Sequence, residues 1–336
     1  MPCESSGVLR RCLLVAVVLL AACDNDGGQD AAVSAPQDWE GATPITGEED
    51  APLGVVATAD GSSVVFTTGR TLVGENAVRR ASVAGGESVV LQAGSESIVP
   101  TDALAVDATH VYASYDRDVV RMPIEGGESE VLTSGRPAGI RYLAVHDGFV
   151  YWTTYQFRGT ADQIELGRVP VAGGEAEQLV VGITDALGRP QFDGDAVLLA
   201  SPIGELRVVP GSAAEVLVPS EQLGGSPTEL AFDDTSLYVT VAGPRRPLRS
   251  VPRAGGDPVV LEADLDTAAA MVIVDGQLVG FDSAGLGRPD SVVAVSIATG
   301  EVRTLATGRF PGRDLTVVPG RGVAFSADSR VWLVPI

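Results

Sequence analysis

Hydrophobic and polar positions alternate in short runs along most of this chain, and turns that carry Asp or Gly separate the runs. The clearest run is Phe149 to Thr153, which follows the Asp147-Gly148 turn and is rich in aromatic and β-branched residues. Alternation with a period of two over such short segments is typical of half-buried β-strands. No long stretch shows a convincing helical period. We therefore predict an all-β protein.

The predicted strands are organised in a repeat of about 43 residues, which a Gly turn after a strand-like run marks. From Gly85 the steps are 41, 47, 38, 44 and 44 residues, and they lead to Gly126, Gly173, Gly211, Gly255 and Thr299. Three strand-like segments precede each turn and one follows it. Four strands in roughly 40–50 residues is the pattern of one blade of a β-propeller.

The number of blades follows from the two ends of the repeat region. Six full periods run from about Leu53 to Thr307, whereas the segment from Leu315 to Ile336 has only three strand-like runs. The segment from Trp39 to Gly47 resembles the Gly turn and fourth strand of the other periods. We therefore predict a seven-bladed β-propeller in which the N-terminal strand completes the last blade, with six or eight blades as the alternatives. Such closure protects the edges of the sheets.

A family resemblance supports this architecture. The pattern Val-Tyr-Trp-Thr, Arg-Val-Pro-x-x-Gly-Gly and Leu-x-x-Gly, clearest from Phe149 to Gly182, resembles the repeats of bacterial propeller lipoproteins with TolB-like and YWTD-type propellers. The turn from Ala298 to Val302 resembles that of YncE-like and quinoprotein-type blades. Thr154 stands where the YWTD pattern has Asp, and the Trp-docking motif of quinoprotein blades is absent, so the resemblance implies no quinone cofactor. It implies a fold rather than a function.

Composition excludes several kinds of chemistry. The 336 residues include 23 basic and 44 acidic side chains, for a net charge of −21, and every basic residue is Arg. Without Lys, a Schiff-base lysine and a Walker-type phosphate loop are excluded. The three Cys are Cys3, Cys12 and Cys23, so the rest of the chain holds no Cys nucleophile and no Cys-bearing metal site. Such an acidic chain would be repelled by nucleic-acid phosphates, and we expect no nucleic-acid partner.

The N-terminal segment resembles the signal peptide of a bacterial lipoprotein. Arg10 and Arg11 precede a run of ten apolar residues from Leu13 to Ala22, which is too short to span a bilayer. The run ends in Leu-Ala-Ala-Cys at Cys23, which resembles a lipobox. The resemblance implies cleavage before Cys23 and acylation of that residue, for example with palmitate. An ordinary secretory signal peptide is the alternative.

This interpretation divides the chain into three parts: a signal peptide over residues 1–22, a lipid-anchored flexible tether over 23–38 and the propeller over 39–336. The tether prediction rests on a composition of Gly, Ala, Asp and Gln with almost no large apolar residue. Two or more acyl chains anchor a protein stably. We expect location in the bacterial cell envelope, at the inner or the outer membrane and on its periplasmic or surface face, as a monomer.

Several repeated polar residues are interpreted as structural. His110 and His146 fall in turns between first and second strands. Asp in such turns bonds to the nearby backbone, which is our interpretation of the set Asp60, Asp107, Asp147, Asp193, Asp233 and Asp275. Arg at one position of the third strand in three blades is expected to pair with a carboxylate on an adjacent blade; the set is Arg80, Arg121 and Arg168.

The best binding candidates are loop arginines and aromatics. The loops after second and after fourth strands share one rim, and they carry Arg70, Arg117, Arg136, Arg158, Arg189, Arg245, Arg246, Arg288, Arg309 and Arg313. Arg and aromatic residues are enriched in binding patches. The predicted binding residues are Tyr155, Arg158, Arg245, Arg246, Arg288 and Arg313. The alternative is that these arginines only make the loops soluble.

Taken together, these features favour a lipid-anchored propeller that acts as a non-catalytic binding or scaffold protein. Its expected partners are the membrane, through Cys23, and an envelope protein. No catalytic residue, no metal ligand and no cofactor is predicted. The alternative is a metal-dependent propeller enzyme of lyase or lactonase type, with a divalent ion held by carboxylates in the central tunnel.

Overall fold

All described residues belong to one unit of the chain, Pro36–Ile336. The computed structural model describes residues 39–47, 52–69, 76–94, 100–115, 117–136, 138–155, 164–181, 187–242, 247–262, 270–282, 289–308, 312–327 and 329–336. The predicted signal peptide and tether therefore lie outside the described residues. Within these ranges no helix is both long and apolar enough to cross a membrane.

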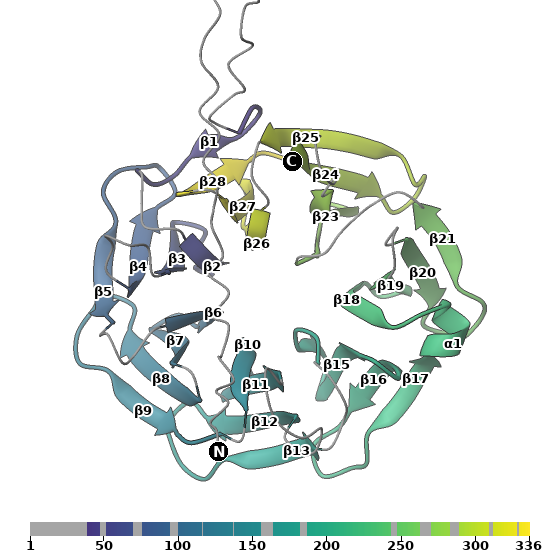
Figure 1. The fold of residues 1–336 in the computed structure, drawn as a ribbon, viewed down its shortest axis with the longest axis horizontal. Coiled ribbons are helices and arrows are strands. Elements are labelled where there is room, and N and C mark those ends of the chain that lie inside the picture. Colours follow the sequence, from purple (N-terminus) through teal and green to yellow (C-terminus); the bar gives the residue numbers. More distant parts are fainter. Residues whose placement is uncertain are drawn as a thin grey trace, which may run out of the picture. The chain divides into compact units, whose positions relative to one another are not determined.

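Seven four-stranded antiparallel sheets form a ring within this unit, as Figure 1 shows. This confirms the predicted seven-bladed β-propeller and excludes six or eight blades. Blade 1 contains β2 (Pro52–Ala57), β3 (Ser63–Thr68), β4 (Ala77–Ser82) and β5 (Val89–Ala93). Blade 2 contains β6 (Pro100–Val106), β7 (His110–Tyr115), β8 (Asp118–Pro123) and β9 (Glu130–Thr133). Blade 3 contains β10 (Gly139–His146), β11 (Phe149–Tyr155), β12 (Glu165–Pro170) and β13 (Glu177–Val181).

The remaining blades repeat this order. Blade 4 contains β14 (Gln191–Asp193), β15 (Ala196–Ser201), β16 (Gly204–Val208) and β17 (Glu215–Pro219). Blade 5 contains β18 (Pro227–Phe232), β19 (Ser236–Val241), β20 (Leu248–Pro252) and β21 (Val259–Glu262). Blade 6 contains β22 (Val272–Val274), β23 (Gln277–Asp282), β24 (Asp290–Ser296) and β25 (Val302–Gly308). Blade 7 contains β26 (Gly312–Val318), β27 (Gly322–Ala327), β28 (Arg330–Val334) and β1 (Thr43–Pro44).

The N-terminal strand completes blade 7, as the sequence predicts. Strand β1 pairs antiparallel with β28, with Thr43 opposite Leu333. A second link joins the same segment to blade 6, because the N–H groups of Glu40 and Thr307 each donate to the other's carbonyl at 2.8 and 2.9 Å. The first and last segments of the repeat region are therefore held together by backbone hydrogen bonds.

One short helix departs from the prediction of strands alone. Helix α1 (Ser220–Leu223) joins β17 to β18 and ends at Gly224, which has a φ of 73°. Its length of four residues explains why no helical period is visible in the sequence.

The core consists of seven apolar clusters, one at each seam between neighbouring blades. Side chains of a strand alternate between its two faces, so each blade contributes to two seams. In β11, for example, Tyr151 packs against blade 4 while Trp152 packs against blade 2. The aromatic and β-branched residues of the second strands are thus typical of a strand that is buried on both faces.

The first strands of the blades lie innermost in the ring (Figure 1). First and second strands run antiparallel, so the turns between them gather at one end of the ring centre, which we call the turn end. The starts of the first strands and the ends of the second strands gather at the other end, which we call the mouth end.

Candidate functional site

A network of polar side chains crosses the ring centre near the mouth end. We call it the central network, and its members are Arg141, Tyr142, Arg189, Glu229 and Asp314. Arg189 in blade 4 donates to Asp314 in blade 7 at 2.7 Å, and Tyr142 in blade 3 donates to Glu229 in blade 5 at 3.2 Å. Neither pair of blades is adjacent in the ring, so both contacts must cross the space that the blades enclose.

Bulges at the starts of the first strands position three of these residues. The pairing register shifts immediately before Tyr142, Glu229 and Asp314, in blades 3, 5 and 7. A similar shift precedes Val55 in blade 1, whose free N–H donates to Asp314 at 3.1 Å. Bulges redirect side chains and are frequent beside functional sites. The network is thus a product of repeated backbone geometry rather than of a local sequence motif.

The charges of the network compensate one another. Burial raises the pKa of Asp314 and of Glu229, while the Arg189 guanidinium opposes that rise in both. Desolvation works against the charged form of Arg189, but the charge of Asp314 foremost, together with that of Glu229 and the hydrogen bond to Asp314, outweighs it and raises the pKa of Arg189. Arg189 therefore stays charged, and leaving it or Asp314 without the other would leave an uncompensated buried charge.

Tyr142 holds the two arginines of the network. The guanidinium carbons of Arg141 and Arg189 each lie 5.1 Å from the centroid of its ring, which is the range of cation–π contacts. The hydroxyl of Tyr142 is buried, and desolvation followed by the charge of Glu229 raises its pKa. Tyr142 therefore acts as a neutral hydrogen-bond donor in this network.

The network is built for holding blades and presenting arginines rather than for ligating a metal. Its carboxylates already accept hydrogen bonds from Arg189, Tyr142 and backbone N–H groups. In the described part of the chain, no three His, Cys, Asp or Glu side chains come together as a metal site.

Only two of the predicted binding residues lie within the described ranges. Tyr155 is the last residue of β11 and is 38 % exposed. Arg313 lies in the bulge of β26, directly before Asp314, and is exposed. Both are at the mouth end. Cys23, Arg158, Arg245, Arg246 and Arg288 lie outside the described residues.

Sequence reasoning found part of the central network and missed most of it. Arg189 was expected as one of many rim arginines, and the structure instead places it in an ion pair with Asp314. Tyr142, Glu229 and Asp314 were not identified, because they come from three distant repeats and share only a position after a bulge. The signal that could have found them is a charged or phenolic residue at the third or fourth position of a first strand.

The turn carboxylates act as the sequence predicts. Asp107 accepts hydrogen bonds from the N–H groups of Thr109 and His110 and from the hydroxyl of Tyr112. Asp233 makes the corresponding bonds in blade 5, with Thr235, Ser236 and Tyr238 as donors. Asp60 in blade 1 accepts from the N–H of Ser62. Hydrogen bonds from the hydroxyls of Thr58 and Ser62 and from the Ser62 N–H lower the pKa of Asp60 to about 2. These groups hold turns together, and the interpretation as turn residues is confirmed for them.

The third-strand arginines pair as predicted in one blade of three. Arg80 forms a bidentate pair with Glu125 of the next blade, at 2.6 and 2.8 Å. Arg121 pairs with Glu130 of its own blade and reaches the next blade only through the carbonyl of Val171. Arg168 pairs with Glu177 of its own blade, so the expected partner on an adjacent blade is wrong there. The fourth strand lies beside the third, which makes its carboxylate the nearer partner.

The two histidines serve packing at separate turns. His146 stacks on Phe192 with 4.3 Å between ring centroids, and its Nε2 lies 2.9 Å from the carbonyl oxygen of Gly194. Nδ1 of His110 lies 2.8 Å from the hydroxyl of Thr109. The prediction that they are turn residues is confirmed.

Glu205 is a buried carboxylate outside the central network. In every blade, one residue of the third strand pairs with the fifth residue of the second strand, and these residues are Val78, Val119, Leu166, Glu205, Leu248, Val292 and Val331. All are buried, and only Glu205 is not aliphatic. Neither of its carboxylate oxygens has a hydrogen-bond partner among the described residues. Burial, and then the charge of Glu229, raises the pKa of Glu205 to about 8.

Comparison with known proteins shows the fold alone. No protein-family model and no curated protein matches the chain. A structure of the mitotic checkpoint complex aligns with a TM-score of 0.64 and 10 % identity, over 96 % of this chain and 99 % of that one. An oligogalacturonate lyase in complex with manganese aligns at 0.62 and 12 % identity, over 90 % and 98 %. A puromycin-hydrolyzing peptidase from Mycobacterium tuberculosis aligns at 0.60 and 22 % identity, over 76 % of this chain but only 44 % of that one. The chain is thus a seven-bladed β-propeller whose structural neighbours include both binding proteins and enzymes.

Proposed function

We propose that this protein is a lipid-anchored propeller of the bacterial cell envelope that binds an envelope partner at its mouth end, without catalysis. The observation that carries the proposal is the central network. Its charged groups, above all Arg189 and Asp314, form ion pairs with one another across the ring centre. A ring centre whose charged groups pair with one another supports binding at the surface of the propeller rather than catalysis in its central tunnel.

The composition of the mouth end indicates the chemistry of the partner. Acidic residues outnumber basic ones by 44 to 23 in the whole chain, but the described part of this end carries, beside Arg189, the arginines Arg117, Arg136, Arg141 and Arg313. The acids Asp118, Asp282 and Asp290 lie at the same end. Tyr155 adds an exposed aromatic ring, and Arg136 lies 5.6 Å from the ring centroid of Trp152. Arginine recognises carboxylates with directed hydrogen bonds, so the proposed partner presents acidic groups.

A crosslinking experiment tests the proposed binding surface. A photoreactive amino acid replaces Tyr155 or Arg313 in the full-length chain, and the native envelope is irradiated. We expect a defined adduct with a second protein from both positions. Ser62 and Thr109, exposed in turns at the opposite end, are the matched controls and should give none. Equal adducts from the two ends, or none from the mouth end, would refute the proposed surface.

The lipid anchor is tested by removing its attachment site. Replacing Cys23→Ser should move the protein from the membrane to the soluble fraction and abolish labelling with palmitate. The reason is that an acidic body is not attracted to anionic headgroups, so the acyl chains alone hold it. Cys12→Ser is the control and should leave both fraction and label unchanged. Membrane association that survives in the Cys23→Ser variant would contradict the anchor.

The enzymatic alternative lacks an observation that favours it. A lyase or lactonase of the expected type needs a carboxylate-held divalent ion, and the described residues bring no such ligand set together. Asp314 and Glu229 would have to leave Arg189 and Tyr142 to supply one. We therefore propose binding alone.

A further inference from the structure

The seam between blades 4 and 5 departs from the repeat at a second position besides Glu205. In five blades the residue after the third strand donates its N–H to a carbonyl in the turn between first and second strands, at 2.8–3.1 Å. We call this the plug position, and it holds Val83, Ile124, Val171, Arg253 and Ile297. The aliphatic members pack into the seam with the preceding blade. Arg253 alone brings a charge to that place.

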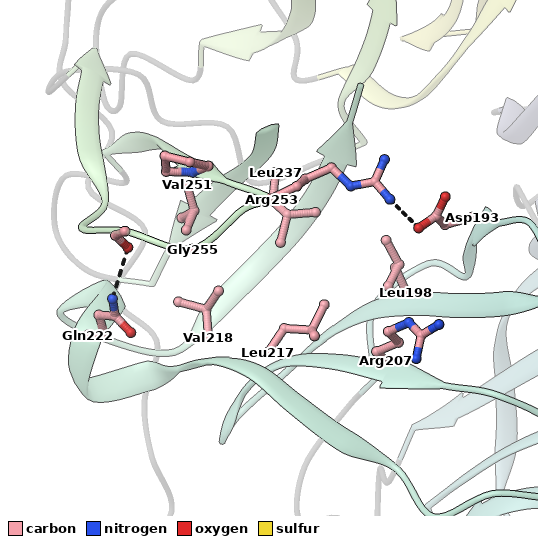
Figure 2. A pocket seen from close by; sticks show the side chains of 12 residues that line it. Asp193, Leu198, Arg207, Leu217, Val218, Gln222, Leu237, Val251, Arg253 and Gly255 are labelled. Atoms are coloured by element: carbon pink, nitrogen blue, oxygen red, sulfur yellow. Dashed lines mark hydrogen bonds and ion pairs between the residues drawn. The ribbon is translucent and has the colours of Figure 1, made fainter. Parts of the chain in front are cut away.

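A cavity of about 300 Å³ lies at this seam, where Arg253 stands instead of an aliphatic residue. Figure 2 shows its apolar wall, which Leu198, Leu217 and Val218 of blade 4 form with Leu237 and Val251 of blade 5. Four of these five belong to the buried cluster of the same seam. The cavity therefore adjoins the apolar core of the seam between blades 4 and 5.

Arg253 does not fill this cavity, because its guanidinium is fastened elsewhere. It forms an ion pair with Asp193 of blade 4 (Figure 2). It also donates to the carbonyl of Asp233 at 3.2 Å. Gln222 closes another side by donating its amide to the carbonyl of Gly256 at 3.1 Å. These contacts hold the side chains of Arg253 and Gln222 at the walls of the cavity, and neither side chain fills it.

One donor in the cavity remains available. Arg207 lines it, is 41 % exposed and forms a long ion pair of 3.9 Å with Glu215. Within the described ranges its guanidinium makes no hydrogen bond. The carboxylate of Asp193, in contrast, is already engaged by Arg253. The guanidinium of Arg207 therefore keeps hydrogen-bond donors for a ligand, which favours an anionic group.

We propose that the seam between blades 4 and 5 binds a branched aliphatic carboxylate. The aliphatic part occupies the place of the missing plug, against Leu198, Leu237 and Val251, and the carboxylate pairs with Arg207. A volume of about 300 Å³ is at the lower end of ligand sites and suits one such group. The ligand is either a free branched-chain acid or the C-terminal residue of a polypeptide. This site lies toward the turn end, so it is independent of the partner proposed for the mouth end.

Titration calorimetry on the full chain tests the site with two probes. The first is 4-methylpentanoate, and the second is the peptide Ala-Ala-Ala-Leu, with its C-terminal amide as control. We expect at least one free carboxylate to bind and the amide to bind about tenfold more weakly. Binding of the acid alone identifies a free acid as the ligand, whereas tighter binding of the peptide identifies a C-terminus. Absence of binding by both, or equal binding of peptide and amide, would overturn the proposal.

Three variants separate the parts of the site. Arg253→Val restores the residue type of the other blades, directs an aliphatic side chain into the seam and should weaken binding about tenfold or more. Arg207→Gln should weaken it about tenfold by removing the charged donor. Arg168→Gln is the matched control, since Arg168 holds the same register position in blade 3, opposite Tyr151 as Arg207 is opposite Leu198. It should bind as the wild type does; binding that survives unchanged in Arg253→Val would rule the cavity out.

Discussion

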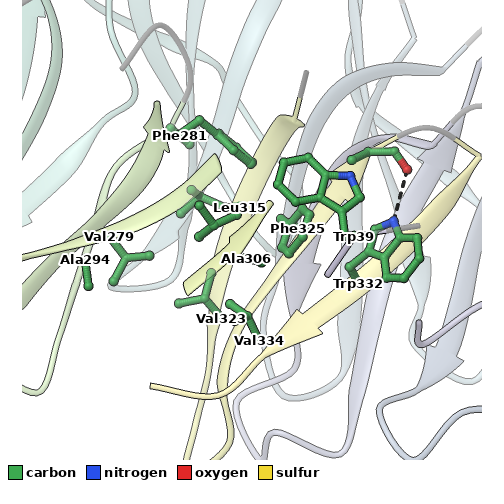
Figure 3. Packing of buried hydrophobic residues seen from close by; sticks show 13 residues of the cluster. Trp39, Val279, Phe281, Ala294, Ala306, Leu315, Val323, Phe325, Trp332 and Val334 are labelled. Atoms are coloured by element: carbon green, nitrogen blue, oxygen red, sulfur yellow. Dashed lines mark hydrogen bonds between the residues drawn. The ribbon is translucent and has the colours of Figure 1, made fainter. Parts of the chain in front are cut away.

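Replacing Trp39→Ala is expected to lower the free energy of unfolding by about 3–5 kcal/mol, the range for large-to-small changes of buried aromatics. Trp39 is only 1 % exposed, and its ring meets that of Phe325 edge-on, with 4.8 Å between centroids. Figure 3 shows it among the buried residues that join blades 6 and 7. Because Trp39 lies on the segment that closes the ring, its loss weakens the last seam as well as the core. Chemical denaturation measures the effect.

Gly308 provides an internal check on this packing. A Cβ atom added there would lie 2.4 Å from the indole of Trp39, so Gly308→Ala should destabilise the wild type by overpacking. In the Trp39→Ala background the indole is gone, and the same change should cost much less. The double-mutant cycle should therefore show strong coupling. Strictly additive effects would mean that the two residues do not pack as the structure has them.

Deletion of residues 39–47 is the more severe form of the same test. It removes β1, the bridge to Thr307 and the buried side chain of Ile45. The edges of β28 and β25 would then be exposed, and the cooperative melting transition should be lost. An unchanged transition would disprove closure by the N-terminal segment.

Most of the fold could be predicted because each blade must satisfy the same local demands. The turn that marks the period needs a positive φ, between 84° and 90°, at Gly85, Gly126, Gly173 and Gly255. This region favours glycine, so the glycines of the sequence reveal the turn. Trp39 and the turn after it could be assigned to blade 7 for the same reason, since they match the fourth-strand segment of the other repeats.

The site was harder to predict because its residues are brought together by the ring and not by the chain. Arg189 and Asp314 are 125 positions apart, and nothing near either residue shows that blades 4 and 7 face each other across the centre. The bulges that place Tyr142 and Glu229 also leave no clear trace in the alternation, because they occur within the first few residues of a strand.

Departures from the repeat were visible in principle once the blades are aligned. Arg253 stands where Val83, Ile124 and Val171 stand in other blades. The obstacle was blade 4, whose Gly turn is reduced to Pro210-Gly211-Ser212, so that the register of Glu205 could not be fixed from sequence. Glu205 and Arg253 both lie at the seam between blades 4 and 5. At this seam, polar side chains stand where other seams have aliphatic ones.

Replacing Glu205→Gln is expected to stabilise the protein at alkaline pH and to remove part of its pH dependence. The pKa of Glu205 is raised from 4.5 to about 8 by burial and by Glu229. The folded state therefore holds a proton that the unfolded state has lost between these two values. Stability falls as pH rises from about 4.5 to about 8, by at most about 1.4 kcal/mol per pH unit for one group. A glutamine keeps the shape of the protonated side chain and cannot ionise.

The difference between variant and wild type isolates Glu205 from the other raised carboxylates. The raised pKa values of Glu229 and Asp314 also lower the free energy of unfolding as the pH rises, but both residues are present in the variant and in the wild type. Urea denaturation at pH 5, 7 and 8.5 should show nearly equal stabilities at pH 5 and a widening advantage of Glu205→Gln above it. Glu205→Leu, which matches Leu166 and Leu248 of the other blades, should be more stable than the wild type at every pH.

Glu221→Gln is the matched control for the loss of one carboxylate. Glu221 lies exposed on α1, next to the same seam, and its replacement should leave the pH profile parallel to that of the wild type. If the pH profile of Glu205→Gln is also parallel to that of the wild type, Glu205 is ionised in the folded protein and must have a partner. A buried carboxylate without a partner lowers the stability of a fold, so a confirmed advantage of Glu205→Gln would show that the folded protein keeps Glu205 protonated at a cost that grows with pH.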